Sequence, residues 1–353
     1  MKVLVGMSGG IDSSTAAYLL KKKGYDTEGI TMLIWKEDSP YPAPAGANSC
    51  YCPEKKEDLA EIDRICKLIG IRHTTVDCSD IFERMVLSNF RSEYMSGRTP
   101  NPCIWCNRNI KFGAMVEYAR SVTDFDYFAT GHYARIRKNE KGRYELLRAL
   151  DRKKDQSYFL SRLSQEQLST TMFPLGEYTK EEIRKIDEEM GFHEPGASES
   201  QDFYSGDYTD LLQVKDKKGD IVLTDGTVLG HHEGYWHYTI GQRKGLAVAY
   251  REPLYVIALD SENNRVIVGT EEYTHSTVVK AENVNFVSDD SFDPDKIYTV
   301  KIRSASPGAE ARVKSTDDGF EVHFLSYVKG AAPGQSAVVY DGDRVVASAF
   351  ICG

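Results

Sequence analysis

Two cysteines stand three residues apart in the stretch TPNPCIWCNRNIKF (residues 99–112), at Cys103 and Cys106. The prolines before them disfavour a helix interior or a central strand, so we expect the pair to lie on a turn. This spacing suits a metal site, a redox couple, or a nucleophile with a helper thiol. The other cysteines are Cys50, Cys52, Cys66, Cys78 and Cys352. An odd count in a long chain favours reduced thiols over a disulfide scaffold.

A second stretch that could do chemistry is KVLVGMSGGIDSSTAAYLL, residues 2–20. It predicts a strand, a glycine turn and a helix N-terminus, where backbone N–H groups and serine hydroxyls can surround a phosphate. The Walker spacing and its lysine are absent. Asp12 would repel a phosphate unless Mg²⁺ lies between them, so we predict a phosphate-binding site that uses Mg²⁺. The alternative is a simple tight turn in which Asp12 caps the helix.

Short β-rich runs alternate with helix-length segments over the first two hundred residues, which predicts parallel βαβ units in an open sheet. One face of the helix predicted over residues 55–70 carries Leu59, Ile62, Cys66 and Ile69. We therefore expect Cys66 to be a core residue. Thr179 and Glu182 have capping-box spacing at the start of a later helix.

Beyond about Tyr204 the chain changes to apolar-alternating runs around two hairpin sequences, Asn263-Asn264 and Asp341-Gly342. The fold class we predict is α/β followed by β. Its domains are a parallel-sheet α/β domain over residues 1–204, a small central domain over 205–275, and a C-terminal β-barrel over 276–353.

Composition narrows the function classes. The chain has 353 residues and a net charge of -9, and it contains no apolar run near the roughly 18 residues of a membrane span. With no secretory signal at its start, we expect a cytoplasmic protein without a membrane partner. Residues 134–154 carry nine Lys or Arg against three acids. This basic stretch predicts either a nucleic-acid contact or a solvated charged hairpin.

Ser8-Gly9-Gly10-Ile11-Asp12-Ser13 resembles the signature loop of the pyrophosphatase-loop (PP-loop) enzymes, which split ATP between its α and β phosphates. Further blocks follow in GRTPNPCIWCNRNIKFGAM, ATGHYARI, KKDQSYFLSRL, FPLGEYTKEEIR, YTIGQRKGL and PGQSAVVYDGD. Together they resemble the bacterial tRNA-specific 2-thiouridylases. That resemblance implies an adenine-nucleotide-hydrolase-like domain, a small central domain and a β-barrel. It also implies a transferase that adenylates the C2 oxygen of the wobble uridine (U34) and then places sulfur on C2.

The same resemblance implies site residues, with ATP and Mg²⁺ as cofactors and with tRNA and an upstream sulfur-donor protein as partners. The ATP site would comprise Gly6, Met7, Ser8, Gly9, Gly10, Ile11, Asp12, Ser13, Met32 and Gly131. The tRNA contacts would comprise Asn101, Pro102, Cys103, His132, Lys154, Asp155, Gln156, Arg303, Ser304 and Gln335.

The cysteines depart from the family pattern at two positions. Cys106 matches the catalytic loop cysteine, but Cys103 replaces an aspartate, and Tyr204 stands where the persulfide-bearing cysteine is expected. The catalytic candidates are therefore Cys106, Cys103 and Asp12.

Three interpretations of this departure stay open. Cys103 takes over as sulfur carrier; or Cys50, Cys52, Cys103 and Cys106 hold an iron-sulfur cluster or zinc; or sulfur transfer is lost and an ATP- and tRNA-binding protein remains. A small-molecule adenylating synthetase is the rival enzyme class.

Overall fold

The computed structural model describes the chain except for residues 37, 42–48, 53–55, 195, 197–202 and 353. Contacts divide it into two compact units. The first comprises Met1–Val86, Pro102–Asp207 and Asp343–Val345. The second comprises Leu87–Asn101, Tyr208–Gly342 and Val346–Gly353. The domain borders expected after residues 204 and 275 stay predictions.

The first unit is built on a parallel sheet, as predicted. Its strand order, within the described residues, is β3-β2-β1-β4-β7. The strands are β1 (Lys2–Gly6), β2 (Asp26–Leu33), β3 (Arg72–Asp77), β4 (Tyr127–Ala129) and β7 (Thr171–Met172). Val3 of β1 pairs in parallel with Thr27 on one side and Tyr127 on the other. The strand order therefore reverses between β1 and β4, and in such sheets ligands bind beyond the carboxyl ends of the strands at this point.

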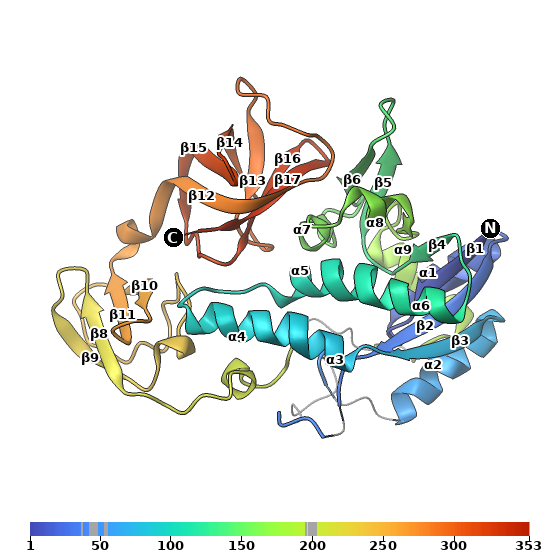
Figure 1. Cartoon of the computed structure of the whole chain (residues 1–353), viewed down its shortest axis with the longest axis horizontal. Coiled ribbons are helices and arrows are strands. Elements are labelled where there is room, and N and C mark those ends of the chain that lie inside the picture. The colour runs from blue at the N-terminus through green and yellow to red at the C-terminus, as the bar shows by residue number, and fades with distance from the viewer. Residues whose placement is uncertain (37, 42–48, 53–55, 195, 197–202, 353) are drawn as a thin grey trace. The chain divides into compact units, whose positions relative to one another are not determined.

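Helices α1 (Ile11–Lys22), α2 (Lys56–Ile69) and α9 (Lys180–Met190) belong to the same unit (Figure 1). The predicted face of α2 packs on Val3 and Val5 of the sheet, with Cys66 only 1% exposed, which confirms it as a core residue. Each aliphatic side chain buried here contributes about 1.5–3 kcal/mol. The predicted capping box of Thr179 and Glu182 is formed at the start of α9.

A helical segment in the first unit runs through α5 (Pro102–Cys106), the π-helical η2 (Asn107–Ala114) and α6 (Met115–Val122). Pro102 is its first residue, where proline is tolerated because that N–H has no helical partner. The expectation that the cysteine pair lies on a turn was therefore wrong: both cysteines are helical. Gln167 of α8 (Gln165–Ser169) donates to the carbonyls of Arg108 and Phe112 at 2.7 and 3.0 Å, which stabilises the widened turn.

Smaller elements complete the first unit. Helix α3 (Ser79–Phe82) leads into the π-helical segment η1 (Glu83–Leu87), whose last residue belongs to the second unit. The basic stretch forms the hairpin of β5 (Ala134–Lys138) and β6 (Tyr144–Arg148), and α7 (Ser157–Leu160) follows.

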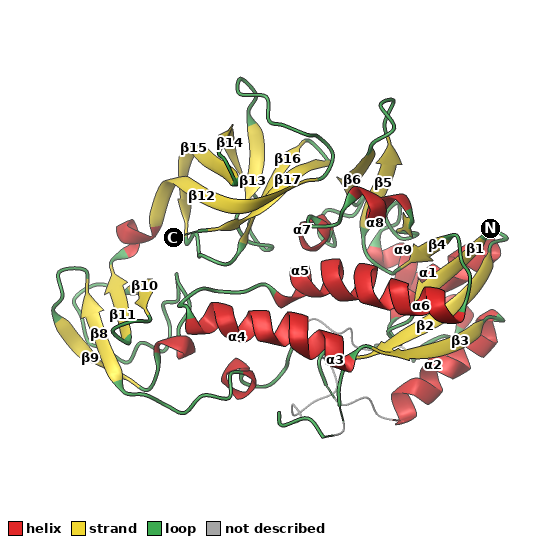
Figure 2. Cartoon of the chain, in the orientation of Figure 1, coloured by secondary structure: helices red, strands yellow, loops and turns green. Residues whose placement is uncertain are grey.

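The second unit contains the predicted β-barrel, whose strands are drawn in yellow in Figure 2. They are β12 (His275–Phe286), β13 (Tyr298–Lys301), β14 (Ala309–Ser315), β15 (Gly319–Lys329), β16 (Ser336–Asp341) and β17 (Arg344–Ile351). Pairing of Ala281 in β12 with Ile351 in β17 closes the barrel. Its interior is apolar, with Val300, Phe320 and Val322 at most 1% exposed.

A smaller sheet in the same unit has the order β10-β11-β8-β9 among the described strands. These are β8 (Gly219–Leu223), β9 (Val228–His232), β10 (Tyr255–Asp260) and β11 (Arg265–Gly269). The predicted hairpins at Asn263-Asn264 and Asp341-Gly342 are both present between paired strands.

Helix α4 (Ser88–Met95) also belongs to the second unit, although it lies early in the chain. The Phe90 ring packs edge-on against Tyr208 at 5.7 Å, and the Arg91 side chain donates to the Leu211 carbonyl at 2.8 Å. Among the described residues, no helix has the length and apolarity needed to span a bilayer.

Candidate functional site

The predicted phosphate loop, residues 7–10, connects the end of β1 to the start of α1. Gly9 has a φ of 77°, a left-handed conformation that glycine adopts without steric cost. The Ser13 hydroxyl accepts from the Ser8 N–H at 3.1 Å and donates to the Gly10 carbonyl at 3.0 Å. These bonds hold the loop around the N-terminus of α1, where backbone N–H groups and the helix dipole favour an anion. Gly10 caps the helix, so Asp12 is available for another role.

Two other predicted ATP residues lie at the carboxyl ends of β2 and β4, the two strands that flank β1. Met32 lies near the carboxyl end of β2, and Gly131 comes two residues after β4. A Cβ atom on Gly131 would lie 2.7 Å from the carbonyl carbon of Asp12. Only glycine fits this approach, so the chain after β4 lies directly against the first turn of α1.

Lys180 is a residue that sequence reasoning missed. Its Nζ lies 2.7 Å from Oδ1 of Asp12, and the Tyr133 hydroxyl donates to the same oxygen at 2.8 Å. Lys180 is 6% exposed and comes from the first turn of α9. The phosphate loop contains no lysine of its own, but Lys180, which is far away in the sequence, places its ammonium group beside the loop. Both contacts use Oδ1, so Oδ2 of Asp12 faces no described hydrogen-bond partner and fits a Mg²⁺ ligand, since carboxylates are the ligands that Mg²⁺ prefers.

His193 also contacts the loop and was not predicted. Its Nε2 lies 2.8 Å from the Gly9 carbonyl oxygen, and its Nδ1 lies 2.8 Å from Oδ1 of Asp187. The imidazole therefore ties α9 to the glycine that shapes the loop. The signal in the sequence is weak, because the residue lies far along the chain from the glycines.

Cys106 is buried at the end of α5, with 8% of its surface exposed, whereas Cys103 in the first turn is half-buried. Burial raises the pKa of the Cys106 thiol to about 12, and the nearby Lys111 ammonium opposes that rise. The charges of Cys103, Cys50 and Cys78 add to the rise, so these thiols lie near enough to influence one another. Residues five apart lie on different sides of an α-helix but complete one turn of a π-helix. The π-helical η2 therefore brings Lys111 to the side of Cys106.

Lys111 and His132 complete the surroundings of the thiols. Two effects act on the pKa of Lys111. Burial lowers it, and negative charge on Cys106, Cys50 and Cys103 raises it. The effect of the cysteine charges is the larger, so the pKa of Lys111 is raised overall. Burial, together with the charge of Lys111, holds the pKa of His132 well below its usual range. A neutral His132 imidazole thus lies beside a cationic lysine, and its Nδ1 is 2.7 Å from the Thr130 hydroxyl.

A separate segment, residues 49–52, carries Cys50 and Cys52. The Tyr51 N–H donates to the Phe203 carbonyl at 2.9 Å, so this segment pairs with the one that contains Tyr204. Tyr204 itself is 2% exposed, with its ring 6.5 Å from that of Tyr51. None of the seven cysteines, all of which the structure describes, forms a disulfide, and no three His, Cys, Asp or Glu side chains in the described structure are arranged to hold a metal ion.

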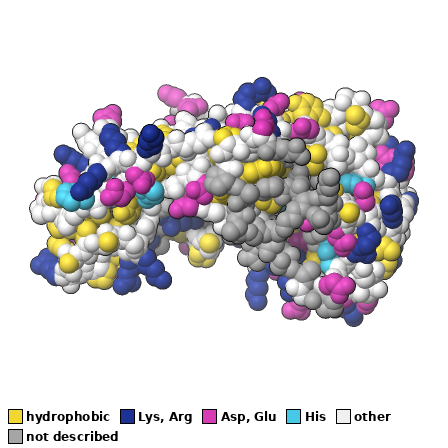
Figure 3. All heavy atoms as spheres, turned by 90° about the horizontal axis from the view of Figure 1, so that it is seen from below, with side chains coloured by type: hydrophobic (Ala, Val, Ile, Leu, Met, Phe, Trp, Pro, Cys, Tyr) yellow, Lys and Arg dark blue, Asp and Glu magenta, His cyan; other side chains and the backbone are white. Residues whose placement is uncertain are grey.

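The predicted tRNA residues of the first unit are all partly buried, and two of them hold a loop in place. Asp155 accepts from the Ala149 N–H at 3.1 Å, and Gln156 accepts from the Tyr133 N–H at 2.9 Å, so both fix the loop that carries Lys154. In the basic hairpin, Arg135 pairs with Asp343 at 2.8 Å and Arg137 with Glu145. Ion pairs therefore neutralise part of the basic stretch. The face shown in Figure 3 likewise mixes basic and acidic side chains.

In the second unit, the predicted tRNA residues hold loops. Arg303 donates to the Ile240 carbonyl at 2.9 Å, and the carbonyl of Ser304 accepts from Lys301 at 2.7 Å. Gln335 donates to the carbonyls of Thr99 and Pro100 at 3.0 and 3.1 Å, beside Asn101, which is 9% exposed. The barrel therefore fixes the chain that leads toward the cysteine pair.

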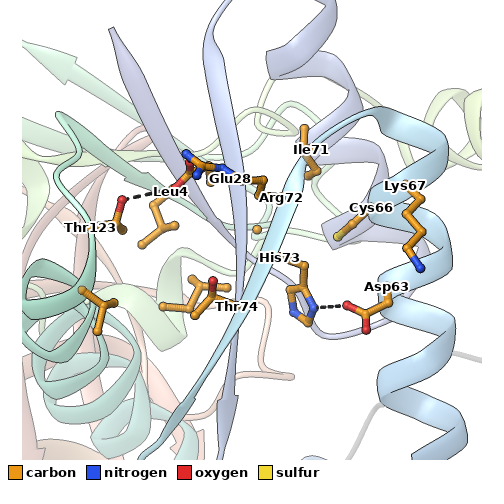
Figure 4. Close-up of a pocket in the computed structure, with 13 residues that line it drawn as sticks. Leu4, Glu28, Asp63, Cys66, Lys67, Ile71, Arg72, His73, Thr74 and Thr123 are labelled. Carbon is orange, nitrogen blue, oxygen red and sulfur yellow. Dashed lines mark hydrogen bonds and ion pairs between the residues drawn. The ribbon is translucent and has the colours of Figure 1, made fainter.

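A hollow of about 420 Å³ in the first unit involves other residues (Figure 4). His73 pairs with Asp63 at 2.6 Å there, and Arg72 pairs with Glu28. Burial raises the pKa of its one cysteine, Cys66, to about 11, so this thiol is a poor nucleophile. None of the predicted site residues lines this hollow.

Comparison with known proteins gives matches along almost the whole chain. Residues 1–204 match the family described as tRNA methyl transferase HUP domain. Residues 211–270 match a tRNA methyl transferase PRC-barrel domain, and 276–351 an aminomethyltransferase beta-barrel domain.

Three curated relatives align with nearly the full chain, and each is named a tRNA-specific 2-thiouridylase MnmA. The protein from Endomicrobium trichonymphae is 43% identical over 358 residues, covering 99% of each chain. Those from Synechocystis sp. and Caldanaerobacter subterraneus are 44% and 42% identical over 359 residues, covering 99% of this chain and 97% of theirs.

Proposed function

Because the chain belongs to the family of tRNA-specific 2-thiouridylases, we propose that it places sulfur on C2 of U34 in tRNA at the expense of ATP. The observation that carries this proposal is that one compact unit holds a formed phosphate loop and a cluster of thiols around Lys111. The first can activate an oxygen and the second can deliver sulfur.

In the activation half, the phosphates of ATP would bind at the N-terminus of α1, beside Lys180. Asp12 would hold Mg²⁺, which supplies positive charge against the phosphates when it is bound. The C2 oxygen of uridine displaces pyrophosphate from the α-phosphorus and becomes an adenylate, which is a far better leaving group. Lys180 and the loop N–H groups stabilise the negative charge that develops on the pyrophosphate.

In the recognition half, the uridine would reach residues 101–103, whereas Lys154 and Arg303 would contact phosphates. Asp155 and Gln156 would act by positioning Lys154, and Gln335 by fixing the chain before Asn101. A wobble base already lies in a single-stranded loop, so its presentation costs little unstacking. A tRNA substrate also supports a cytoplasmic location.

In the sulfur half, Cys106 would be the principal thiol and Cys103 its neighbour. An upstream sulfur-donor protein would supply the sulfur. Cys50, Cys52, Cys103 and Cys106 do not form a metal-binding group in the described structure, so we derive no step through an iron-sulfur cluster or zinc. Thiolates remain strong nucleophiles near neutral pH once formed, which suits them to carry sulfur.

The test is reconstitution of the purified chain with ATP, Mg²⁺, inorganic polysulfide and a tRNA that has uridine at position 34, with and without oxygen. We expect 2-thiouridine and an equal amount of pyrophosphate, both dependent on tRNA. Absence of 2-thiouridine under both conditions would contradict the proposal. Pyrophosphate release with an amino acid or nucleotide in place of tRNA would favour a small-molecule synthetase. Binding of tRNA without turnover would favour a non-catalytic protein.

A further inference from the structure

We propose that Cys50 is the thiol that receives the incoming sulfur and carries it as a persulfide, in place of the cysteine that Tyr204 replaces. The inference rests on the proposed function, which requires a sulfur carrier besides Cys106. It assigns that role to a residue on a different segment of the chain from either cysteine of the family pattern.

The first support is the backbone contact between residues 49–52 and residues 203–205. The Tyr51 N–H donates to the Phe203 carbonyl at 2.9 Å, and the Ser49 and Ser205 hydroxyls lie 3.5 Å apart. A thiol at position 50 therefore lies on the chain adjacent to position 204. In the family pattern the carrier thiol is at position 204. We place it at position 50, on the segment that pairs with residues 203–205.

The second support is the packing of the residue that replaces the expected cysteine. Tyr204 is buried, and the Tyr51 ring that it approaches stacks on Phe203 at 6.0 Å and on Phe82 at 5.2 Å. Position 204 is thus used for an aromatic core. Cys50, between Ser49 and Tyr51, is exposed to solvent.

The third support is access, which separates Cys50 from the other thiols. A donor protein must bring its own persulfide sulfur into contact with the receiving thiolate. Cys106 is 8% exposed and Cys103 is half-buried in the first turn of α5, whereas Cys50 is exposed. Cys50 also lies near enough to Cys106 and Lys111 for their charges to interact. An exposed entry thiol is thus paired with a buried thiol beside a lysine.

The chemistry balances as three displacements. The Cys50 thiolate attacks the outer sulfur of a donor persulfide, which leaves Cys50–S–SH and a donor thiolate. The deprotonated outer sulfur then attacks C2 of the adenylated uridine, and AMP leaves with the former C2 oxygen. Finally the Cys106 thiolate attacks the Cys50 sulfur, which releases 2-thiouridine and forms a Cys50–Cys106 disulfide. A dithiol reductant supplies two electrons and two protons to restore both thiols.

The experiment compares wild type, Cys50→Ser and the matched control Cys352→Ser, which removes a thiol of the second unit. Each protein is loaded with inorganic polysulfide, desalted, and mixed with tRNA and ATP·Mg²⁺ without reductant. Persulfides and disulfides are mapped by peptide mass spectrometry, and 2-thiouridine and pyrophosphate are measured in parallel. We expect the persulfide on Cys50, a Cys50–Cys106 disulfide after turnover, and loss of about 100-fold or more of 2-thiouridine in Cys50→Ser. Pyrophosphate release should stay within about twofold of wild type in both variants.

Several results would overturn the assignment. These are a persulfide on Cys103 with a Cys103–Cys106 disulfide, full activity of Cys50→Ser, a parallel loss of its pyrophosphate release, or stoichiometric iron with labile sulfide in anaerobically purified protein. Failure of the proposed function is a different result, because wild type itself would then release no pyrophosphate and form no 2-thiouridine.

Discussion

The phosphate loop and the thiol cluster lie in the same compact unit, yet they are assembled differently. The loop comes from one contiguous stretch, and its conformation is set by Gly9 and by bonds among Ser8, Gly10 and Ser13. The thiols come from two segments, residues 49–52 and the helix that begins at Pro102, and their surroundings include a third, residues 203–205.

This difference is the physical basis of the proposed change of sulfur carrier, which affects the thiol cluster and leaves the phosphate loop as it is. A contiguous loop cannot exchange residues without losing its shape, whereas segments that meet in space can exchange a thiol between neighbouring positions. Activation and sulfur delivery should therefore be separable by mutation. The following predictions test that separation.

The largest effect is expected for Cys106→Ser. A serine hydroxyl is almost entirely protonated near neutral pH, so it cannot replace the thiolate, and 2-thiouridine formation should fall at least about 10³-fold. Pyrophosphate release in the presence of tRNA should persist. Equal loss of both activities would show that the two regions act as one.

A loss of about 100-fold in pyrophosphate release is expected for Lys180→Met and for Asp12→Asn, since each removes charge aimed at the phosphates. The double variant should lose less than the product of the two, because the residues contact each other at 2.7 Å. Persulfide loading of Cys50 is the control and should be unchanged. Additive losses would argue against the pair acting as a unit.

An effect of about tenfold is expected for Lys111→Met on sulfur transfer from preloaded enzyme, since the lysine opposes the rise in the pKa of Cys106 to about 12. Only the thiolate reacts, and the raised pKa means that it is scarce near neutral pH. The wild-type rate should therefore rise about tenfold per pH unit from pH 7 to 9. Lys111→Arg, which keeps the charge, should retain most of the rate. A flat pH profile would show that another group limits transfer.

The smallest effect is expected for Gln167→Ala, which removes the donor to Arg108 and Phe112 in η2. The free energy of unfolding should fall by about 1–3 kcal/mol in urea titrations, and sulfur transfer should slow a few-fold because Lys111 is displaced. Gln165→Ala is the matched control: its amide contacts the Tyr144 backbone, so it should lose stability without slowing transfer. Equal slowing in both variants would point to general destabilisation.

The sequence predicts well those features that are formed by residues close together in the chain. The parallel sheet, the barrel, the hairpins and the core position of Cys66 follow from local patterns, and the loop at Gly9 follows from residues next to one another. Lys180 could not be predicted, because it lies 168 residues from its partner Asp12. The helical cysteine pair was missed because Pro102 was taken as a helix breaker when it is a helix start. The contact of Tyr51 with Phe203 leaves no local pattern at all.

Helix α4 has a consequence for synthesis on the ribosome. Its contacts with Tyr208 and Leu211 join residues that are separated by more than one hundred positions. At typical translation speeds, α4 emerges on the order of ten seconds before those partners exist. During that interval Phe90, which is 2% exposed in the finished fold, lacks its cover. The nascent chain therefore passes through a stage in which the Phe90 side chain of α4 has not yet met its partners, and slower translation before residue 208 would lengthen its exposure to aggregation.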